Sequence, residues 1–146
     1  MNQCIEKYGA DILSSRRFSR AYLIPHHKQH CVAQHSLRVA DRACRISDWL
    51  IRRGVQVSRE DVVRASLLHD IGMTEEKVYA SHSWEKAYSH PRLSAEIAKT
   101  EFHANEVQQE AIRHHMLPVC IIPPAHLTGW ILLAADKICS IREVIS

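Results

Sequence analysis

Glycine and proline are scarce in this chain, which has four glycines and five prolines among its 146 residues. All-β proteins need many tight turns, and those turns are usually built from glycine and proline. Their scarcity therefore disfavours an all-β fold and favours long helices. Apolar residues make up 46% of the chain and charged residues 24%, which is typical of a globular protein. A domain usually has about 100–200 residues, so this length predicts a single domain.

Long apolar runs are also missing. The longest strongly apolar run, residues 130–135, is far shorter than the ~18 residues that a membrane-spanning helix needs. The first residues lack a basic stretch followed by an apolar one, so we expect no secretory signal. The five cysteines are odd in number and form no Cys-x-x-Cys pair. They predict free thiols in a reducing cytoplasm, with neither a disulfide framework nor a zinc ribbon.

Charge is only weakly biased, with a formal net charge of +3. Lysine and arginine are scattered and form no basic stripe interleaved with aromatic residues. Nucleic acid is therefore not expected as the main partner, and neither is a membrane. A mildly basic balance does suit a small phosphorylated substrate.

Apolar residues recur at helical spacing along most of the chain, as in Val39, Ala43, Ile46 and Leu50. Helices are expected over residues 30–53, 58–72, from 91 onward, from 105 onward, and over 127–144. Residues 73–88 are expected to be irregular or weakly helical. Residues 1–29 are expected to form a peripheral helical segment, and residues 30–146 the main domain. The sequence thus predicts an all-α bundle of five to six or more helices, a single domain overall.

Histidine is unusually abundant, with 11 residues. Several histidines share the inner faces or ends of the expected helices with aspartates: His35, His69, Asp70, His90, His114, His115 and Asp136. Asp136 follows the apolar run 130–135 and is expected to be buried, where a carboxylate needs a cation. Imidazoles and carboxylates together suit divalent transition metals. One inward histidine is more often a hydrogen-bonded core residue, but five helices presenting such groups predict a metal site in the bundle core.

The remaining histidines do not fall on these faces. They are expected on the surface or in loops, with His82 the first exception to consider: His26, His27, His30, His82, His103 and His126.

Three strings of residues carry a resemblance to a known family. They are Gln34-His-Ser-Leu-Arg-Val-Ala40, Ala65-Ser-Leu-Leu-His-Asp-Ile-Gly72 and Ala134-Ala-Asp-Lys137. The order His, His-Asp, Asp resembles the signature of the HD superfamily of metal-dependent phosphohydrolases, and His-Asp-Ile-Gly resembles its HDIG subgroup. The resemblance covers residues 30–140. It implies an all-α fold with the metal site in the core of the bundle.

The resemblance also implies a ligand set for two divalent metal ions, of iron, manganese, magnesium, zinc or nickel. His35, His69 and Asp136 would hold one ion, His90 and a second histidine the other, and Asp70 would bridge them. His69 and Asp70 would be the catalytic pair, and a metal-activated bridging hydroxide would attack phosphorus. The second histidine is His115 or His114; the family pattern and the helical spacing both favour His115, and His114 stays as the alternative.

Two departures from the family pattern affect the subgroup and the substrate. HDIG proteins often continue with lysine, where this chain has Met73, so the phosphate contact would fall to another cation: Arg38, Lys77, Arg113 or Lys137. The segment after His115 lacks the Gly-Tyr-Pro stretch of the cyclic-di-GMP phosphodiesterases. Cys31 stands where a trinuclear relative would have glutamate, which argues against a third metal.

The sequence therefore predicts a metal-dependent phosphohydrolase, acting on phosphoric esters or anhydrides. Its substrate is expected to be a small phosphoester, with a nucleotide favoured. Two alternatives stay open at this point. One is a di-iron oxygenase of the HD fold, because the ligands alone do not decide the reaction. The other is a non-catalytic metal- or nucleotide-binding module, which the missing lysine supports.

Overall fold

The computed structural model describes residues 2–27, 29–79 and 83–145, without the side chains of residues 79 and 83–88. Within this part of the chain there are eight α-helices, one short 3₁₀ helix and no strand beyond an isolated bridge between Pro25 and Cys31. The elements are α1 (Gln3–Leu13), α2 (Arg16–Ala21), α3 (Val32–Ile51), α4 (Arg59–Leu68), η1 (Ile71–Thr74), α5 (Glu76–Tyr79), α6 (Ser83–Phe102), α7 (Glu106–Arg113) and α8 (Leu127–Ile145). The all-α fold class is confirmed.

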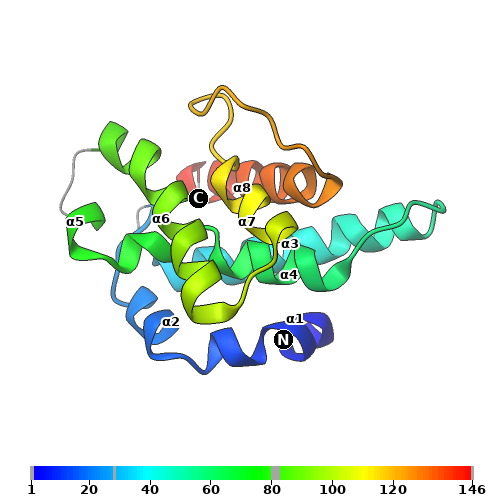
Figure 1. Ribbon diagram of the computed structural model, residues 1–146, viewed down its shortest axis with the longest axis horizontal. Helices are drawn as coiled ribbons and strands as arrows, with labels where there is room; N and C mark the ends of the chain where they lie inside the picture. Colours follow the sequence, from blue (N-terminus) through cyan, green and yellow to red (C-terminus); the bar gives the residue numbers. More distant parts are fainter. Residues whose placement is uncertain (1, 28, 80–82, 146) are drawn as a thin grey trace.

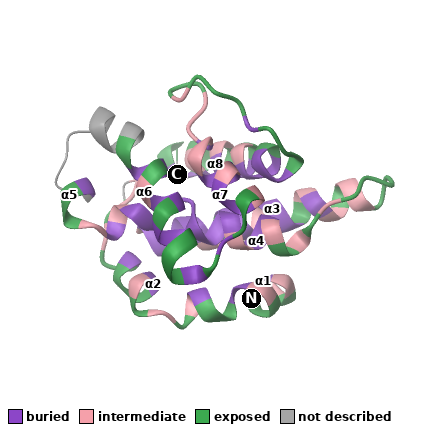
Figure 2. Ribbon diagram, viewed as in Figure 1, coloured by how far each residue is buried: buried purple, intermediate pink, exposed green. Residues whose placement is uncertain are grey.

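The helices surround a central pair. In Figure 1, α3 and α4 run across the middle of the molecule, α8 lies above them, and α1 and α2 lie below. The segment between α7 and α8 loops away from the body at the top of the view. Figure 2 shows that buried residues gather along the central pair and on the facing sides of the outer helices. The bundle core therefore lies around α3 and α4.

Several helices begin where the sequence predicts because their N-cap side chains bind the first-turn amides. Ser58 Oγ accepts from the Asp61 amide at 3.2 Å, and Asn105 Oδ1 accepts from the Gln108 amide at 2.8 Å. At the start of α3, Cys31 and Gln34 form a capping box. Such caps satisfy amides that have no partner inside the helix.

The core contains the apolar faces that the spacing predicts. Val39 and Ala43 of α3 are buried, as are Val62 and Leu68 of α4. The N-terminal helices join the same core through Ile5, Ile12 and Phe18. Among the helices in the described part of the chain, none is long and apolar enough to cross a membrane. All five cysteines are free.

The prediction for residues 73–91 needs correction. Pro91 lies inside α6, which begins at Ser83, and residues 71–79 form η1 and α5. A proline removes its own hydrogen bond to the fourth residue before it, and its ring crowds that residue's carbonyl. Packing of α6 along η1 and α7 nevertheless holds the helix on both sides of Pro91. His82 lies outside the described residues.

Gly72 of η1 packs directly against the backbone of α6. A Cβ atom there would lie 2.8 Å from the His90 carbonyl oxygen and 2.9 Å from the Ser94 amide nitrogen. These are backbone atoms, so α6 itself would have to move. We expect Gly72→Ala to lower the free energy of unfolding by about 1–3 kcal/mol, the usual cost of overpacking. Denaturant unfolding monitored by circular dichroism measures this change.

Gly54→Asn is the matched control. Gly54 has a positive φ of 84° and nothing within 4 Å of its Cβ position, and asparagine tolerates that conformation. We expect this control to change stability little. Equal unfolding free energies for the two variants would contradict the close approach at Gly72.

Candidate metal centre

Six buried side chains from five helical segments meet in the core. They are His35 of α3, His69 and Asp70 at the end of α4, His90 of α6, His115 just after α7, and Asp136 of α8. These residues are separated by up to 101 positions in the sequence. The folding of the bundle brings them into one cluster.

Two helix ends present their histidines in the same way. The Nδ1–H of His69 donates to the Ser66 carbonyl at 2.7 Å, and that of His115 donates to the Ile112 carbonyl at 2.6 Å. Because a carbonyl only accepts hydrogen bonds, the proton of each neutral ring is on Nδ1. The lone pair of each Nε2 is thus directed into the cluster. Orienting bonds of this kind are typical of metal-ligating histidines.

Asp70 lies at the middle of the cluster, with one carboxylate oxygen toward each histidine pair. Its Oδ2 lies 3.2 Å from His69 Nε2 and 3.7 Å from His35 Nε2. Its Oδ1 lies 3.0 Å from His90 Nε2 and 3.4 Å from His115 Nε2. His90 and His115 in turn approach each other at 3.1 Å through their Nε2 atoms. One carboxylate therefore connects two separate sets of nitrogen ligands.

Asp136 supplies a second carboxylate to the His35 and His69 side. Its Oδ1 lies 2.9 Å from His35 Nε2 and 3.5 Å from His69 Nε2. Ser140, one turn later on α8, donates to the same oxygen at 3.3 Å. The buried carboxylate that the apolar run predicted thus has histidine partners.

The ring of His69 tests whether the cluster fits a metal ion. Its Nε2 is buried and makes no hydrogen bond with any described residue, although oxygens of Asp70 and Asp136 lie within 3.5 Å. In the neutral ring this lone pair would face negatively charged oxygens, an arrangement that is stabilised either by a cation between them or by a proton on the ring. Groups of three donors lie within 4.8 Å of one another, including His35–His69–Asp136 and His69–Asp70–His115. Imidazole and carboxylate donors in this arrangement fit divalent transition metals.

Without metal, protons balance the charge of the cluster. Burial disfavours protonation of His35, but hydrogen bonds to Asp136 and Glu143 outweigh it and raise the pKa to about 9. Burial likewise opposes protonation of His69, and the Asp70 and Asp136 carboxylates raise its pKa well above the usual value. Burial favours the protonated form of both aspartates, yet the histidines hold their pKa values well below the usual range.

These shifts predict how the stability of the metal-free protein varies with pH. A histidine whose folded pKa is raised stabilises the fold below its unfolded pKa of 6.5, and that stabilisation is lost as pH rises through the folded value. For His35 alone, raising the pH from 6.5 to above 9 is expected to remove about 3 kcal/mol of unfolding free energy. Urea unfolding in the presence of a chelator measures this loss.

Saturating Mn²⁺ is the control for that experiment. Metal ligands must be deprotonated, so metal affinity rises with pH. We expect Mn²⁺ to remove or reverse the loss of stability. A metal-free protein with constant stability between pH 6.5 and 9.5 would contradict the proposed charge balance.

Three residues near the cluster were not expected there. Glu143 accepts from Nδ1 of His35 at 2.9 Å, and it is buried. His26 stacks on the ring of His35 with centroids 4.0 Å apart, and its Nε2 lies 3.5 Å from Asp70 Oδ2. His26, His27 and Glu143 form a further group of possible metal donors.

The sequence held a signal for only one of these residues. Glu143 comes seven positions after Asp136, on the same face of α8. His26 and His27 are positioned by a turn in which the His26 amide donates to the His30 carbonyl at 2.8 Å. Helical periodicity gives no information on such a turn.

His114 lies apart from the cluster. Its Nδ1 contacts Oε2 of Glu110, one helical turn earlier, at 2.6 Å, and its ring is only partly buried. His115 is fully buried among the other candidate ligands. Of the two alternatives that the sequence left open, the structure brings His115 to Asp70.

The four candidate phosphate contacts are dispersed. Lys137 lines a cavity of about 480 Å³ over the cluster, together with Asp70 and Met73. Its Nζ lies 3.9 Å from Asp136 Oδ2. The other three lie elsewhere: Arg38 pairs with Glu143, Arg113 lines a different cavity, and Lys77 is exposed on α5.

Comparison with known proteins gives one match. A family model described as HD domain matches residues 32–138, which is more than two thirds of the chain. The matched range includes all six clustered residues. No match was found among curated proteins or among solved structures.

Proposed function

The chain belongs to the HD-domain family, and from this premise we propose that it is a phosphohydrolase that uses two divalent metal ions to cleave a small phosphoester. A nucleotide is the favoured substrate. The HD family consists in general of metal-dependent hydrolases.

The arrangement of Asp70 is the observation that carries the proposal. Its two oxygens lie at 3.0–3.7 Å from five imidazole Nε2 atoms. Those of His35, His69 and His26 lie near Oδ2, and those of His90 and His115 lie near Oδ1. A carboxylate that only stabilised the core would need one cationic partner. A carboxylate between two sets of metal donors is what a two-metal hydrolase requires.

The chain has residues that could hold the two ions. His35, His69 and Asp136 would hold one, His90 and His115 the other, and Asp70 would contact both. Bound divalent ions lower the pKa of water and neutralise charge that develops on phosphoryl oxygens.

The remaining residues orient these ligands and form the substrate cavity. Glu143 holds the His35 ring through Nδ1, and backbone carbonyls hold His69 and His115. The cavity over the cluster has about 480 Å³, a volume suited to a small molecule. Lys137 provides a cation at its edge, while Pro25 and Met73 provide apolar walls. We assign Lys137 to the phosphate group and the apolar walls to the rest of the substrate.

Metal analysis combined with a hydrolysis assay tests the proposal. The protein as isolated is expected to contain bound divalent metal. Chelation should abolish hydrolysis of bis(p-nitrophenyl) phosphate and of a panel of nucleotides, and adding back Mn²⁺, Zn²⁺ or Fe²⁺ should restore it. Magnesium-free buffer without added metal is the control.

Two other results would replace the proposal. Iron-dependent oxygen uptake without any phosphatase activity would support the oxygenase alternative. Tight nucleotide binding without turnover under every metal would support the binding module. If the protein contains no bound metal and added metal does not stabilise it, the phosphohydrolase, the oxygenase and the metal-binding module are all overturned.

A further inference from the structure

A second cavity, of about 600 Å³, adjoins the metal centre. It is formed by the N-terminal part of α1, the middle of α3 and the C-terminal part of α8. Among the described residues, it shares no lining side chain with the cavity over Asp70. Glu143 connects it to the metal centre, because this residue lines the second cavity and also binds His35.

Three arginines give this cavity an excess of positive charge: Arg38, Arg42 and Arg142. Only two carboxylates line it. Asp41 is ion-paired with Arg45 at 3.0 Å, and Glu143 is bound by both Arg38 and His35. Neither Arg42 nor Arg142 makes a hydrogen bond or ion pair with the described part of the chain. Within the part of the chain that the structure describes, two guanidinium groups of the cavity therefore have no carboxylate partner.

The rest of the lining is largely apolar. Ile5, Leu37 and Cys139 contribute to the wall. Burial raises the pKa of the Cys139 thiol to about 11, so it is a neutral, apolar group at physiological pH. A volume of about 600 Å³ with apolar walls and a few charged groups is typical of a site for a small organic molecule.

We propose that this cavity binds a small phosphate monoester with an apolar body, as a ligand distinct from the substrate. Arginine presents a planar fork of donors that matches phosphate oxygens. A phosphate monoester carries about −1.5 to −2 charges at pH 7, which matches the two uncompensated guanidinium groups. A carboxylate would neutralise only one of them. The apolar body would lie against Ile5 and Leu37.

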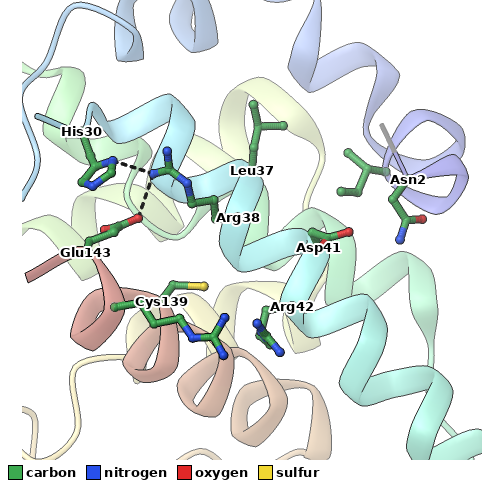
Figure 3. A pocket seen from close by; sticks show the side chains of 10 residues that line it. Asn2, His30, Leu37, Arg38, Asp41, Arg42, Cys139 and Glu143 are labelled. Atoms are coloured by element: carbon green, nitrogen blue, oxygen red, sulfur yellow. Dashed lines mark hydrogen bonds and ion pairs between the residues drawn. The ribbon is translucent and has the colours of Figure 1, made fainter. Parts of the chain in front are cut away.

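Arg38 connects the proposed ligand to the metal centre. Figure 3 shows its guanidinium between His30 and Glu143 at one end of the cavity, with Arg42 and Cys139 further along. Arg38 Nη1 lies 3.1 Å from Glu143 Oε1, and the same carboxylate binds His35 Nδ1. A phosphate that draws Arg38 away from Glu143 would change the orientation of His35. The ligand and the metal ion would therefore influence each other's affinity.

Phenylphosphonate is a suitable probe because a phosphoester hydrolase does not cleave its carbon–phosphorus bond. Calorimetric titration of the intact chain should show binding. Inorganic phosphate lacks the apolar body and benzoate lacks the second charge, so both should bind more weakly. Arg42→Gln and Arg142→Gln should each weaken phenylphosphonate binding about tenfold, the effect of about 1.4 kcal/mol.

Two control variants distinguish the cavities. Arg52→Gln removes an exposed arginine just after the same helix as Arg42 and should not change binding. Lys137→Gln removes the cation over the metal centre and should not change it either. Loss of binding in Lys137→Gln but not in the two cavity variants would place the probe at the substrate site and overturn the proposal, as would failure of phenylphosphonate to bind.

The connection between the cavity and the metal centre through Arg38 is tested by metal binding, which does not depend on catalysis. Saturating phenylphosphonate should change the dissociation constant for Mn²⁺ by about fivefold or more. Arg38→Met should remove this dependence. An unchanged Mn²⁺ affinity with the probe bound would overturn the connection, whether or not the protein hydrolyses phosphoesters.

Discussion

Replacement of Asp70 by asparagine is expected to abolish both metal retention and phosphoester hydrolysis. Asp70 presents one carboxylate oxygen to each of the two histidine pairs. Asparagine has nearly the same shape but no charge, so the histidines would keep their positions and lose the central anion. If the bound metal provides about 4 kcal/mol of transition-state stabilisation, the rate should fall about 10³-fold.

Folding must be measured beside activity for this variant. Asp70 is buried against histidines, and removing one partner of a buried charged pair is destabilising. Circular dichroism and thermal unfolding establish whether the variant is folded. Asp48→Asn is the matched control, since it removes a surface carboxylate that pairs with Arg59 at 2.8 Å, and such pairs contribute little.

Retention of metal and of the full rate by a folded Asp70→Asn protein would contradict the central role of this carboxylate. Loss of activity with full metal content would contradict its role as a ligand. It would then be a residue that acts on the substrate.

The second large effect is expected at two adjacent histidines. His115→Ala should strongly reduce metal binding and hydrolysis, whereas His114→Ala should not. His115 lies 3.4 Å from Asp70 Oδ1 and 3.1 Å from His90 Nε2. Even partners that only orient a ligand are worth 10–100-fold in metal affinity or activity. Removing His115 itself is therefore expected to weaken metal binding by at least about 100-fold and to reduce hydrolysis accordingly.

His114→Ala is an internal control for this experiment. Its side chain binds Glu110 at the end of α7, so its loss should cost a fraction of a kcal/mol in stability and leave the metal content unchanged. Metal titration by calorimetry on the two variants measures the difference. Equal effects, or a larger effect for His114→Ala, would show that the pair is assigned in the wrong order.

Local sequence signals determined most of the helical organisation. The spacing of Val39 and Ala43 and the capping residues Ser58 and Asn105 act within one or two turns of helix, and the structure has helices at those places. Pro91 is the instructive failure. The local preference of proline predicts that a helix begins at Pro91, but α6 begins at Ser83. The packing of α6 against η1 is a tertiary interaction, and the sequence of residues 83–91 alone does not indicate it.

The order of His35, His69-Asp70, His90, His115 and Asp136 was visible in the sequence because each lies on an inner face or an end of its own helix. Periodicity gives the side of a helix that a residue occupies. It does not give the distance between residues on different helices, so the sequence alone left His114 and His115 as alternatives. The hydrogen bond of His115 to the Ile112 carbonyl, and the resulting approach to Asp70, come from the packed structure.

By itself, then, the sequence determined an all-α fold, the membership of the HD family and most of the helices that carry the candidate metal donors. Only the tertiary structure decided which atoms meet. It directs the two oxygens of Asp70 to opposite histidine pairs, brings His26 from a loop onto His35, and connects Glu143 to the arginine-lined cavity. The physical reason is that hydrophobic patterning and caps are local, whereas charge pairing and burial in the core depend on contacts between residues far apart in the chain.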